Sequence, residues 1–325
     1  MYGIRGWQTG HTADRDRDRI YSETLSYMNP ASAGSDARWT GLISESVTQH
    51  YGAQARSDSY VYDAAGRLTS SKLETGISYD SNGNVTALRR LSAAGATTAD
   101  LTMTYAGNRL QTVTNKGTED KGTFSYAYDS SGNLTSDPHN RLEIQNNVLN
   151  LPMRVEQSGT GTMGGTMTYT YLGDGTRAAA RVGAAPSRYA GKRYRGSFVY
   201  DVSLAGVQRL ESVAVSTGRL IALTGTNGAV SFESDGFITD HLGNVAAIVN
   251  LSASPATGTK NAILEQNDYT PFGTRLTSAL KTQAANRWRY AGKEEQDIAG
   301  MNLHLLDSTI RIIFLPSGII YIYEA

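Results

Sequence analysis

The sequence predicts a mainly β fold, a large curved antiparallel sheet of short hairpins with at most one short helix. Three observations support this prediction. A Tyr-Asp-x-x-Gly motif recurs along the chain. Segments between its copies alternate polar and apolar residues, as half-buried strands do. The 325 residues include 34 Gly and 19 Tyr but only 7 Pro, which favours strands joined by tight turns.

The repeated motif is clearest in Tyr62–Thr69, Tyr79–Thr86 and Tyr128–Thr135, and Asp240–Val245 keeps its centre. In all four copies Gly follows Asp by three positions, and Leu or Val comes soon after. The residues expected to build the repeat turns are Tyr62, Asp63, Gly66, Tyr79, Asp80, Gly83, Asn84, Tyr128, Asp129, Gly132 and Asn133. Weaker copies occur at Tyr105–Leu110, Tyr171–Arg177 and Tyr269–Leu276, at irregular intervals. The unit is therefore a hairpin with variable loops.

Each residue type in the motif has a physical role in a turn. The Asp side chain can accept backbone N–H groups two residues on and so start the turn. Gly supplies the positive φ, and Asn is expected to tolerate the left-handed conformation beside it. The Leu or Val then begins the returning strand. Tyr buries a flat ring and keeps its hydroxyl for water or a carbonyl.

Two segments near the C-terminus stand apart from this pattern. Thr277–Trp288 is the best candidate for the one short helix. Ile312–Leu315 and Ile319–Tyr323 are apolar and β-prone, and Pro316-Ser317-Gly318 separates them. They form either a hairpin docked on a sheet edge or an aggregation-prone appendage.

Charge and composition argue against several classes of protein. The 30 basic and 30 acidic residues balance, so no broad nucleic-acid footprint is expected. The chain has no Cys, which excludes disulfides, thiol catalysis and Cys-ligated zinc. No run of about 18 apolar residues predicts a membrane span. The first residues lack the apolar core of a signal peptide, so an export signal is expected elsewhere or by another route.

Candidate chemical sites each have a simpler explanation. Asp80–Asn84 loosely resembles a calcium loop, but Leu91 occupies the position that needs a bidentate Glu. Asp240-His241 could suggest acid–base chemistry, yet a turn role is favoured. Glu294-Glu295, and Asp201 with Glu211, could mimic a glycosidase pair, but such pairs arise by chance in a chain with 30 acids. The sequence predicts no catalytic residue, cofactor or metal ligand, and no enzyme.

The repeated motif resembles that of the Rhs/YD-repeat family of bacterial shell proteins. The second half resembles the family's repeat-associated core domain in the order of three short motifs. The residues that carry this resemblance are Asp240, His241, Leu242, Gly243, Asn244, Tyr269, Pro271, Phe272, Gly273, Tyr290, Gly292, Lys293 and Glu294. Tyr2–Trp7 is similar to a stretch in Bacteroidetes-type members. The resemblance covers roughly residues 1–304 and divides the chain into repeats (1–225), a core-like region (226–304) and an atypical apolar tail (305–325).

The resemblance implies a partial shell. In the family, repeats wind into a hollow cocoon, the core domain plugs its end, and an aspartate-based cleavage frees a C-terminal toxin. Family members act in interbacterial competition or as secreted and surface proteins. Here His304–Pro316 replaces the expected Tyr- and Arg-rich continuation, and neither cleavage segment nor toxin follows. A truncated or frameshifted member is therefore expected, whose partners would be the rest of a larger shell or a toxin.

Two functions remain open on sequence grounds. The first is structural: the wall and core plug of a toxin-enclosing shell. The alternative is a cell-surface module that binds carbohydrate or protein on a Tyr-lined concave face. Because exposed sheet edges invite pairing, poor solubility or oligomerisation of the isolated chain is expected.

Overall fold

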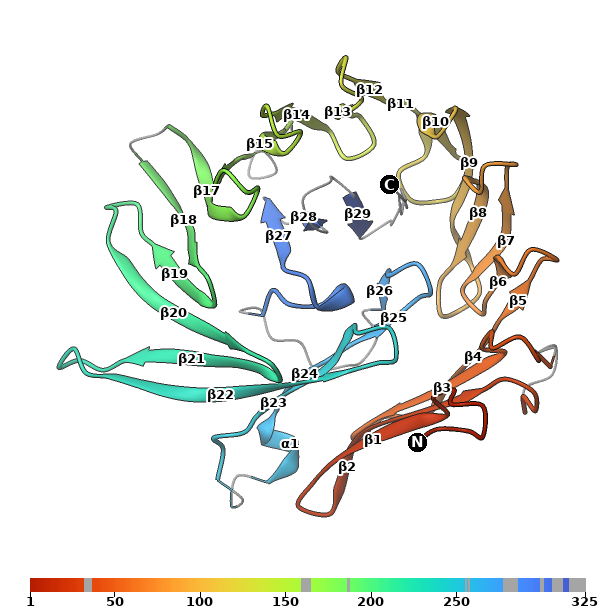
Figure 1. The fold of residues 1–325 in the computed structure, drawn as a ribbon, viewed down its shortest axis with the longest axis horizontal. Coiled ribbons are helices and arrows are strands. Elements are labelled where there is room, and N and C mark those ends of the chain that lie inside the picture. The colour runs from red at the N-terminus through yellow and green to blue at the C-terminus, as the bar shows by residue number, and fades with distance from the viewer. Residues whose placement is uncertain are drawn as a thin grey trace. The chain divides into compact units, whose positions relative to one another are not determined.

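The computed structural model describes residues 1–31, 37–158, 165–185, 188–254, 256, 258–276, 286–298, 301–305 and 312–315. These residues form a mainly antiparallel β structure, which confirms the predicted fold class (Figure 1). Their helical elements include α1 (Thr259–Ala262) and the 3-10 turn η2 (Tyr290–Gly292). The helix predicted at Thr277–Trp288 lies largely outside the described residues.

The chain forms two compact units that do not follow chain order. The first unit comprises Met1–Thr123, Ile238–Val249 and Ala253–Gly292. The second comprises the described parts of Phe124–Phe237, Asn250–Ser252 and Lys293–Ala325. The core-like region predicted from sequence thus contributes to both units, and residues 238–292 fold largely with the N-terminal 123 residues.

The first unit contains a four-stranded sheet in the order β1-β2-β3-β4, called here the N-terminal sheet, and a five-stranded sheet in the order β11-β10-β9-β8-β7. The strands are β1 (Gly10–Arg15), β2 (Asp18–Ser26), β3 (Glu45–His50), β4 (Arg56–Ser59), β5 (Val61–Tyr62), β6 (Leu68–Ser70), β7 (Glu74–Tyr79), β8 (Val85–Leu91), β9 (Thr97–Ala106), β10 (Arg109–Asn115) and β11 (Gly122–Ser125), whose last two residues belong to the second unit. Later in the chain come β23 (Val245–Asn250), β24 (Ile263–Gln266), β25 (Asp268–Tyr269) and β26 (Arg275–Leu276).

A thirteen-stranded antiparallel sheet runs in strict chain order from β12 to β24. Its strands β12 to β22 are β12 (Ala127–Tyr128), β13 (Leu134–Asp137), β14 (Leu142–Asn146), β15 (Pro152–Gln157), β16 (Gly165–Tyr171), β17 (Arg177–Ala185), β18 (Arg188–Arg195), β19 (Phe198–Val202), β20 (Gln208–Val215), β21 (Gly218–Thr224) and β22 (Val230–Thr239). A separate sheet holds β27 (Glu295–Ile298), β28 (Met301–Leu305) and β29 (Ile312–Leu315). Ile312–Leu315 is therefore a strand, as predicted, whereas 316–323 lie outside the described residues.

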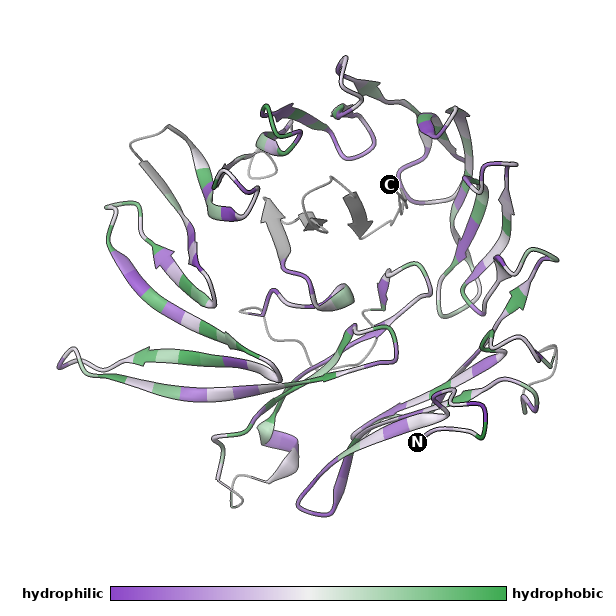
Figure 2. Ribbon diagram, viewed as in Figure 1, coloured by the Kyte–Doolittle hydropathy of each residue, from purple (hydrophilic) through white to green (hydrophobic). Residues whose placement is uncertain are grey.

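Alternation along the strands builds the core of each unit. In β9, Ala99, Leu101 and Met103 are buried and the residues between them are not. In the second unit, Ile144, Val155 and Met167 are directly paired across β14, β15 and β16, and all three are buried. Figure 2 shows hydrophilic and hydrophobic residues following one another along such strands. Burying each large side chain stabilises the fold by about 1.5–3 kcal/mol.

A second apolar cluster lies between the N-terminal sheet and the later strands of the first unit. Ile20 and Tyr21 on β2 pack with Ala247 and Val249 on β23 and with Ile263 on β24. Each of these side chains is nearly inaccessible to solvent. This cluster holds β23 and β24 against β2, which brings the motif residues of the core-like region close to the N-terminal sheet.

Candidate functional site

One turn recurs eleven times in the described residues. In each copy the N–H of the first residue donates to the carbonyl of the fifth, and the N–H of the fourth donates to the carbonyl of the first. The fourth residue always has a positive φ. This is a type I turn followed by a bulge residue, a common hairpin connection. The eleven first residues are Gly3, Asp63, Asp80, Ser92, Asp129, Asn147, Leu172, Ser203, Gly225, Asp240 and Thr270.

The four Asp copies share one set of side-chain bonds. In each, Oδ1 accepts the N–H groups of the third and fifth residues at 2.9 Å. Oδ2 accepts the side chain of the fifth residue, at 2.7 Å from Arg67 and at 2.8 Å from Asn84. The same bond reaches Asp129 at 2.9 Å and Asp240 at 2.7 Å. The predicted role of Asp in starting the turn is confirmed.

The expected role of Asn was wrong in one respect. Gly66, Gly83, Gly132 and Gly243 supply the positive φ, but the Asn residues that follow do not adopt it. Each Asn instead uses its side chain to hold the Asp and to reach a neighbouring segment. Asn84 Nδ2 also donates to Gly107 O at 3.1 Å. Asn133 Nδ2 donates to Asn150 Oδ1 at 2.9 Å.

Five of the Tyr residues that precede a turn donate their hydroxyl to an earlier segment of the chain. The Tyr79 hydroxyl donates to Leu68 O at 2.7 Å, and the Tyr105 hydroxyl donates to Val85 O at 2.8 Å. In both pairs the acceptor is the first residue of the strand that returns from the preceding turn. The hydroxyls of Tyr171 and Tyr269 make equivalent bonds to Pro152 O and Val245 O, and that of Tyr62 donates to Ile43 O. Burial raises the pKa of Tyr79 to about 12, so this hydroxyl keeps its proton.

The three core-like motifs converge in the first unit. Asn244 Oδ1 accepts the N–H of Ala291 at 2.7 Å, which joins the Asp240 turn to η2. The Tyr269 and Tyr290 rings lie 6.0 Å apart. Gly273 has φ +87°, and a Cβ there would lie 2.5 Å from the Tyr290 ring. Residues 240–244, 269–273 and 290–292, called here the motif cluster, therefore pack as one group.

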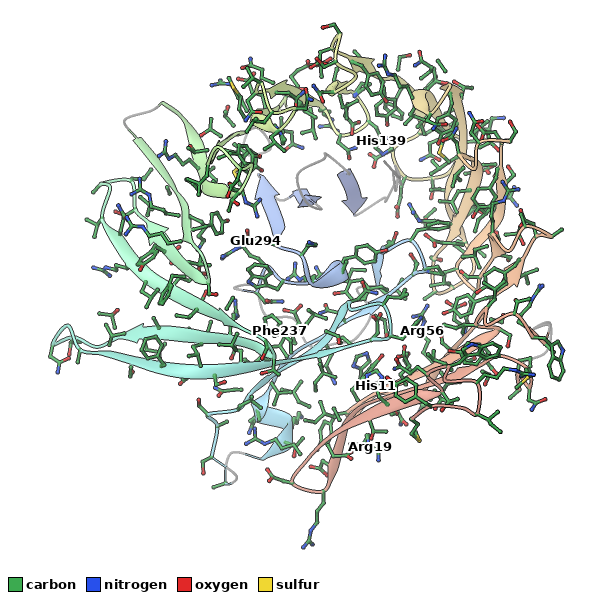
Figure 3. The ribbon with its side chains drawn as sticks, in the orientation of Figure 1. His11, Arg19, Arg56, His139, Phe237 and Glu294 are labelled. Atoms are coloured by element: carbon green, nitrogen blue, oxygen red, sulfur yellow. The ribbon has the colours of Figure 1, made fainter. Side chains whose placement is uncertain are left out.

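The remaining motif residues have distinct surroundings. The Phe272 N–H donates to Glu74 Oε2 at 3.2 Å, and the fully buried Glu74 also pairs with Arg90 at 2.7 Å. Leu242 is largely exposed. In the second unit, Glu294 Oε2 accepts Arg177 Nη2 at 2.9 Å and the Tyr194 hydroxyl at 2.7 Å (Figure 3 labels Glu294). Lys293, just before it, is half-buried.

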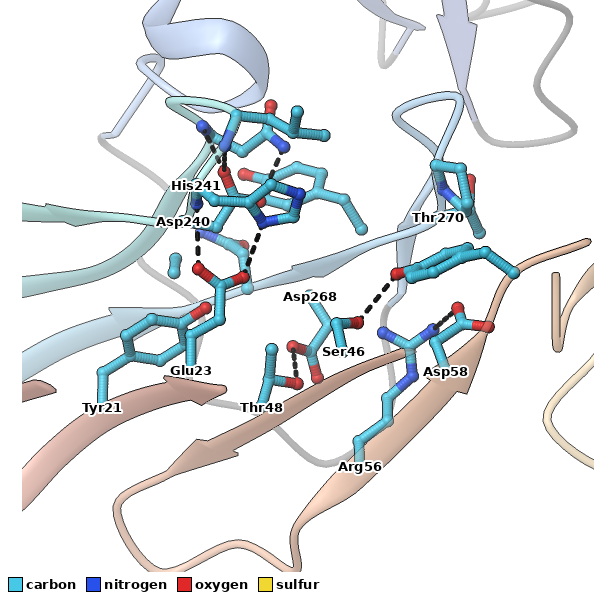
Figure 4. A pocket seen from close by; sticks show the side chains of 17 residues that line it. Tyr21, Glu23, Ser46, Thr48, Arg56, Asp58, Asp240, His241, Asp268 and Thr270 are labelled. Atoms are coloured by element: carbon cyan, nitrogen blue, oxygen red, sulfur yellow. Dashed lines mark hydrogen bonds and ion pairs between the residues drawn. The ribbon is translucent and has the colours of Figure 1, made fainter. Parts of the chain in front are cut away.

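A small polar pocket lies between the N-terminal sheet and the motif cluster (Figure 4). Its volume is about 50 Å³, enough for a few water molecules. It is lined by Tyr21, Glu23, Ser46, Thr48, Arg56, Asp58, Tyr60, Asp240, His241, Leu242, Asn244, Ala246, Asn267, Asp268, Tyr269, Thr270 and Pro271. The pocket thus combines four carboxyl groups with one guanidinium and one imidazole.

Each acidic side chain of the pocket has a polar partner. Glu23 binds His241 twice, through Nδ1 at 2.8 Å and through the backbone N–H at 3.0 Å. Asp268 Oδ1 lies 3.1 Å from His50 Nε2. Asp58 pairs with Arg56 at 3.2 Å. The fourth carboxylate, Asp240, holds its own turn.

Burial shifts the acidity of these groups in different directions. Burial raises the pKa of Asp58 and of Asp240 above the usual value. Burial also acts to raise the pKa of Asp268, but the hydrogen bond and charge of His50 outweigh it and the pKa is lowered. Burial acts to lower the pKa of His241, and the hydrogen bond and charge of Glu23 outweigh it, so the pKa is raised.

The alternative chemical sites considered from sequence have structural partners. Both carboxylate oxygens of Asp80 accept donors from its own turn. Lys192 Nζ binds both Asp201 and Glu211, the supposed glycosidase pair. Within the described ranges no three His, Asp or Glu side chains are arranged to hold a metal ion. The side chain of Glu295 is outside the described part of the chain.

Sequence reasoning missed the partners of the motif residues. Glu23, His50 and Glu74 lie on β2, β3 and β7, far from the motif cluster in the chain. Their only local signal is a polar residue at a position where strand alternation expects a buried one. Five turns were also missed, those at Gly3, Ser92, Asn147, Ser203 and Gly225. A glycine at the fourth position could have marked four of them, namely Gly6, Gly95, Gly206 and Gly228.

Comparisons with known proteins gave structural matches alone. No family model and no curated protein matches the chain. The chain aligns with "Crystal Structure of TcdB2-TccC3-TEV" over 92% of its length and 19% of that chain, with 13% identity and a TM-score of 0.35. A Photorhabdus luminescens Tc holotoxin pore carrying TccC3-D651A aligns over 91% and 19%, with 14% identity and a TM-score of 0.34. "TcdB2-TccC3-Cdc42" aligns over 90% and 19%, with 13% identity and a TM-score of 0.35.

The chain thus spans about a fifth of the length of these structures. TM-scores at this level do not establish a shared fold. Among the described residues, no helix has the length and apolar character needed to cross a membrane.

Proposed function

We propose that this chain is a structural wall segment of an Rhs/YD-type β shell, with the motif cluster as part of its core-like plug. The wall would enclose a cargo supplied by a C-terminal toxin or by the rest of a larger shell. In this proposal the chain is not an enzyme, and it acts outside the cell, secreted or at the surface.

The observation that carries this proposal is the tie between successive hairpins. Tyr79 and Tyr105 each donate to the first residue of the strand returning from the previous turn. Arg67 and Asn84 reach from one turn to the backbone of the next, at Asp80 O and Gly107 O. A side chain can form a hydrogen bond to the neighbouring hairpin only when successive hairpins lie side by side. Such bonds suit a wall that grows edge to edge.

The alternative, a Tyr-lined binding face, has less support. A glycan-binding Tyr must leave its ring and hydroxyl free for the ligand. The hydroxyls of Tyr62, Tyr79, Tyr105 and Tyr171 instead donate to backbone carbonyls, and their rings are half-buried. These bonds are the ones a sheet-building role needs.

The test combines the mass of the purified full chain in solution with a glycan array. The wall proposal predicts concentration-dependent association in light scattering, with β-rich sheets or rings in negative-stain electron microscopy, because unpaired edge strands template further pairing. It also predicts no glycan binding. A sharp monomer at all concentrations would contradict the proposal. Glycan binding lost in Tyr79→Ala but kept in an exposed control, Ser81→Ala, would favour the binding module.

A further inference from the structure

Three of the five histidines of the chain gather at one place in the first unit. The rings of His11 and His50 lie 5.5 Å and 5.1 Å from the Tyr21 ring, one from β1 and the other from β3. His241 reaches the same region from the motif cluster and binds Glu23, which neighbours Tyr21 on β2. His11 Nδ1 lies 3.5 Å from the other oxygen of Glu23. Three imidazole rings thus gather where the N-terminal sheet meets the motif cluster.

Two His–carboxylate pairs join the N-terminal sheet to the motif cluster. The sheet supplies the carboxylate of one pair and the histidine of the other. In one, the carboxylate Glu23 belongs to the N-terminal sheet and His241 to the motif cluster, 2.8 Å apart. In the other, His50 belongs to the sheet and Asp268 precedes the motif residue Tyr269, 3.1 Å apart. Glu23 and His50 are 2% and 3% exposed, so water cannot replace either partner easily.

We propose that these two pairs form a proton-operated clasp, which holds the motif cluster on the N-terminal sheet at mildly acidic to neutral pH and loosens in alkali and in strong acid. The clasp does not depend on the wall proposal, because it concerns only how one part of the first unit is held on another.

The charge balance of the junction explains why protons matter. Four carboxyl groups line the pocket, Glu23, Asp58, Asp240 and Asp268, and Arg56 is the single permanently charged cation among its lining residues. Of the elements packed here, β1 adds His11, β2 adds Tyr21, β3 adds His50, and β25 adds Tyr269. The tyrosines stay neutral because burial raises their pKa. Beside Arg56, His241 offsets part of this negative charge while it holds a proton, and Glu23 raises its pKa.

The sign of each pair defines the pH window. The pKa of His241 is raised in the fold, so its contribution is present below its usual pKa and is lost as pH rises through the raised value. The pKa of Asp268 is lowered, so its contribution is present above its usual pKa and is lost as pH falls through the lowered value. Burial raises the pKa of Asp240, so its ionisation lowers the stability of the fold as pH rises through the raised value.

Hydrogen exchange of the full chain, read by mass spectrometry from pH 2 to pH 9 and corrected for intrinsic rates, tests the clasp. The molecule supplies its own reference, because the turns at Asp80 and Asp129 have the same backbone bonds as the Asp240 turn and no histidine. Protection of 240–245 relative to these turns should fall about fivefold between pH 6 and pH 9, the difference between a charge-assisted and a neutral hydrogen bond.

Variants separate the charge from the fold. His241→Gln should lower the protection of 240–245 at pH 6 and abolish its fall between pH 6 and pH 9. His241→Lys should keep this protection to higher pH. Ser130 holds the place in the Asp129 turn that His241 holds in the Asp240 turn, so Ser130→Gln is the matched control and should change nothing. His50→Gln should remove only the loss of protection in strong acid. Equal pH profiles for the three turns, or a profile that His241→Gln leaves unchanged, would overturn the proposal.

Discussion

The Asp129 turn and the Asp240 turn have the same backbone hydrogen bonds, but the pKa values of their Asp residues shift in opposite directions. Both use Oδ1 to accept two N–H groups at 2.9 Å and Oδ2 to accept an Asn side chain. At the surface, the bond from Asn133 and those from the backbone hold the pKa of Asp129 below its usual value. At Asp240, burial at the junction with the N-terminal sheet raises the pKa despite the same bonds. Local sequence thus sets the turn, and its surroundings set its acidity.

The largest predicted effect is at the junction that buries the Asp240 turn. Glu23→Ala leaves His241 without its acceptor in a site that water cannot reach well, and should lower the free energy of unfolding by about 4 kcal/mol. Asp14→Ala breaks an ion pair with Arg19 in which both side chains are half-exposed, and should cost no more than about 0.5 kcal/mol. Urea unfolding measures both. Equal losses would mean that the junction does not hold the motif cluster.

The next effect separates backbone strain from crowding. Gly83 and Gly273 occupy the same position of two turns with φ +87°, but only Gly273 faces a neighbour, the Tyr290 ring. Gly83→Ala should cost about 1–2 kcal/mol from the left-handed backbone alone. Gly273→Ala should cost about 3 kcal/mol, because a Cβ must displace the ring as well. Gly83→Asn should cost less than Gly83→Ala, since Asn150 holds this position in another turn. Thermal unfolding would contradict this order if the two Ala variants matched.

A smaller effect follows from the opposite pKa shifts of Asp129 and Asp240. Asp129→Asn and Asp240→Asn lose the same Oδ2 acceptor, so their comparison isolates the charge. The lowered pKa of Asp129 means that its charge stabilises the fold at pH 7 and ceases to do so as pH falls through that pKa. The charge of Asp240 acts against the fold and is relieved by acid. Asp129→Asn should therefore lower Tm more at pH 7 than at pH 3, and Asp240→Asn should lower it more at pH 3.

The smallest effect concerns a turn that has no glycine at its left-handed positions. The β1–β2 hairpin places Asp16 (φ +50°) and Arg17 (φ +79°) in the left-handed region without a glycine. Arg17→Gly should raise the free energy of unfolding by about 0.5–1 kcal/mol, because glycine adopts this conformation without a steric penalty. A loss of stability in urea unfolding would show that the Arg17 side chain contributes more than the strain costs.

Much of the fold could be predicted from the sequence because the turns are local. Asp accepting the third and fifth N–H groups and Gly at the fourth position need only five consecutive residues. Ser92, Asn147 and Ser203 were missed because a shorter hydroxyl or an amide replaces the carboxylate of Asp. The role of Asn was misread for a related reason, since its side chain serves a segment more than 15 residues away in the chain.

The polar junction could not be predicted in the same way. Glu23 and His241, or His50 and Asp268, are joined by packing between distant strands, and each looks like an ordinary polar strand or turn residue. The apolar contact of Ile20 and Tyr21 with Ala247 and Ile263 brings them together. The sequence contains these side chains but not the register that pairs them.

Carbon NMR of the Asp carboxyl groups against pH, with the chain labelled at Asp, is the most direct test. It measures whether Asp residues in the same type of turn have different pKa values. The structure predicts that Asp63, Asp80 and Asp129 titrate below the usual Asp value, through hydrogen bonds from their own turns, and that Asp240 titrates above it, through burial. One common pKa for all four, or a lowered pKa at Asp240, would contradict the account.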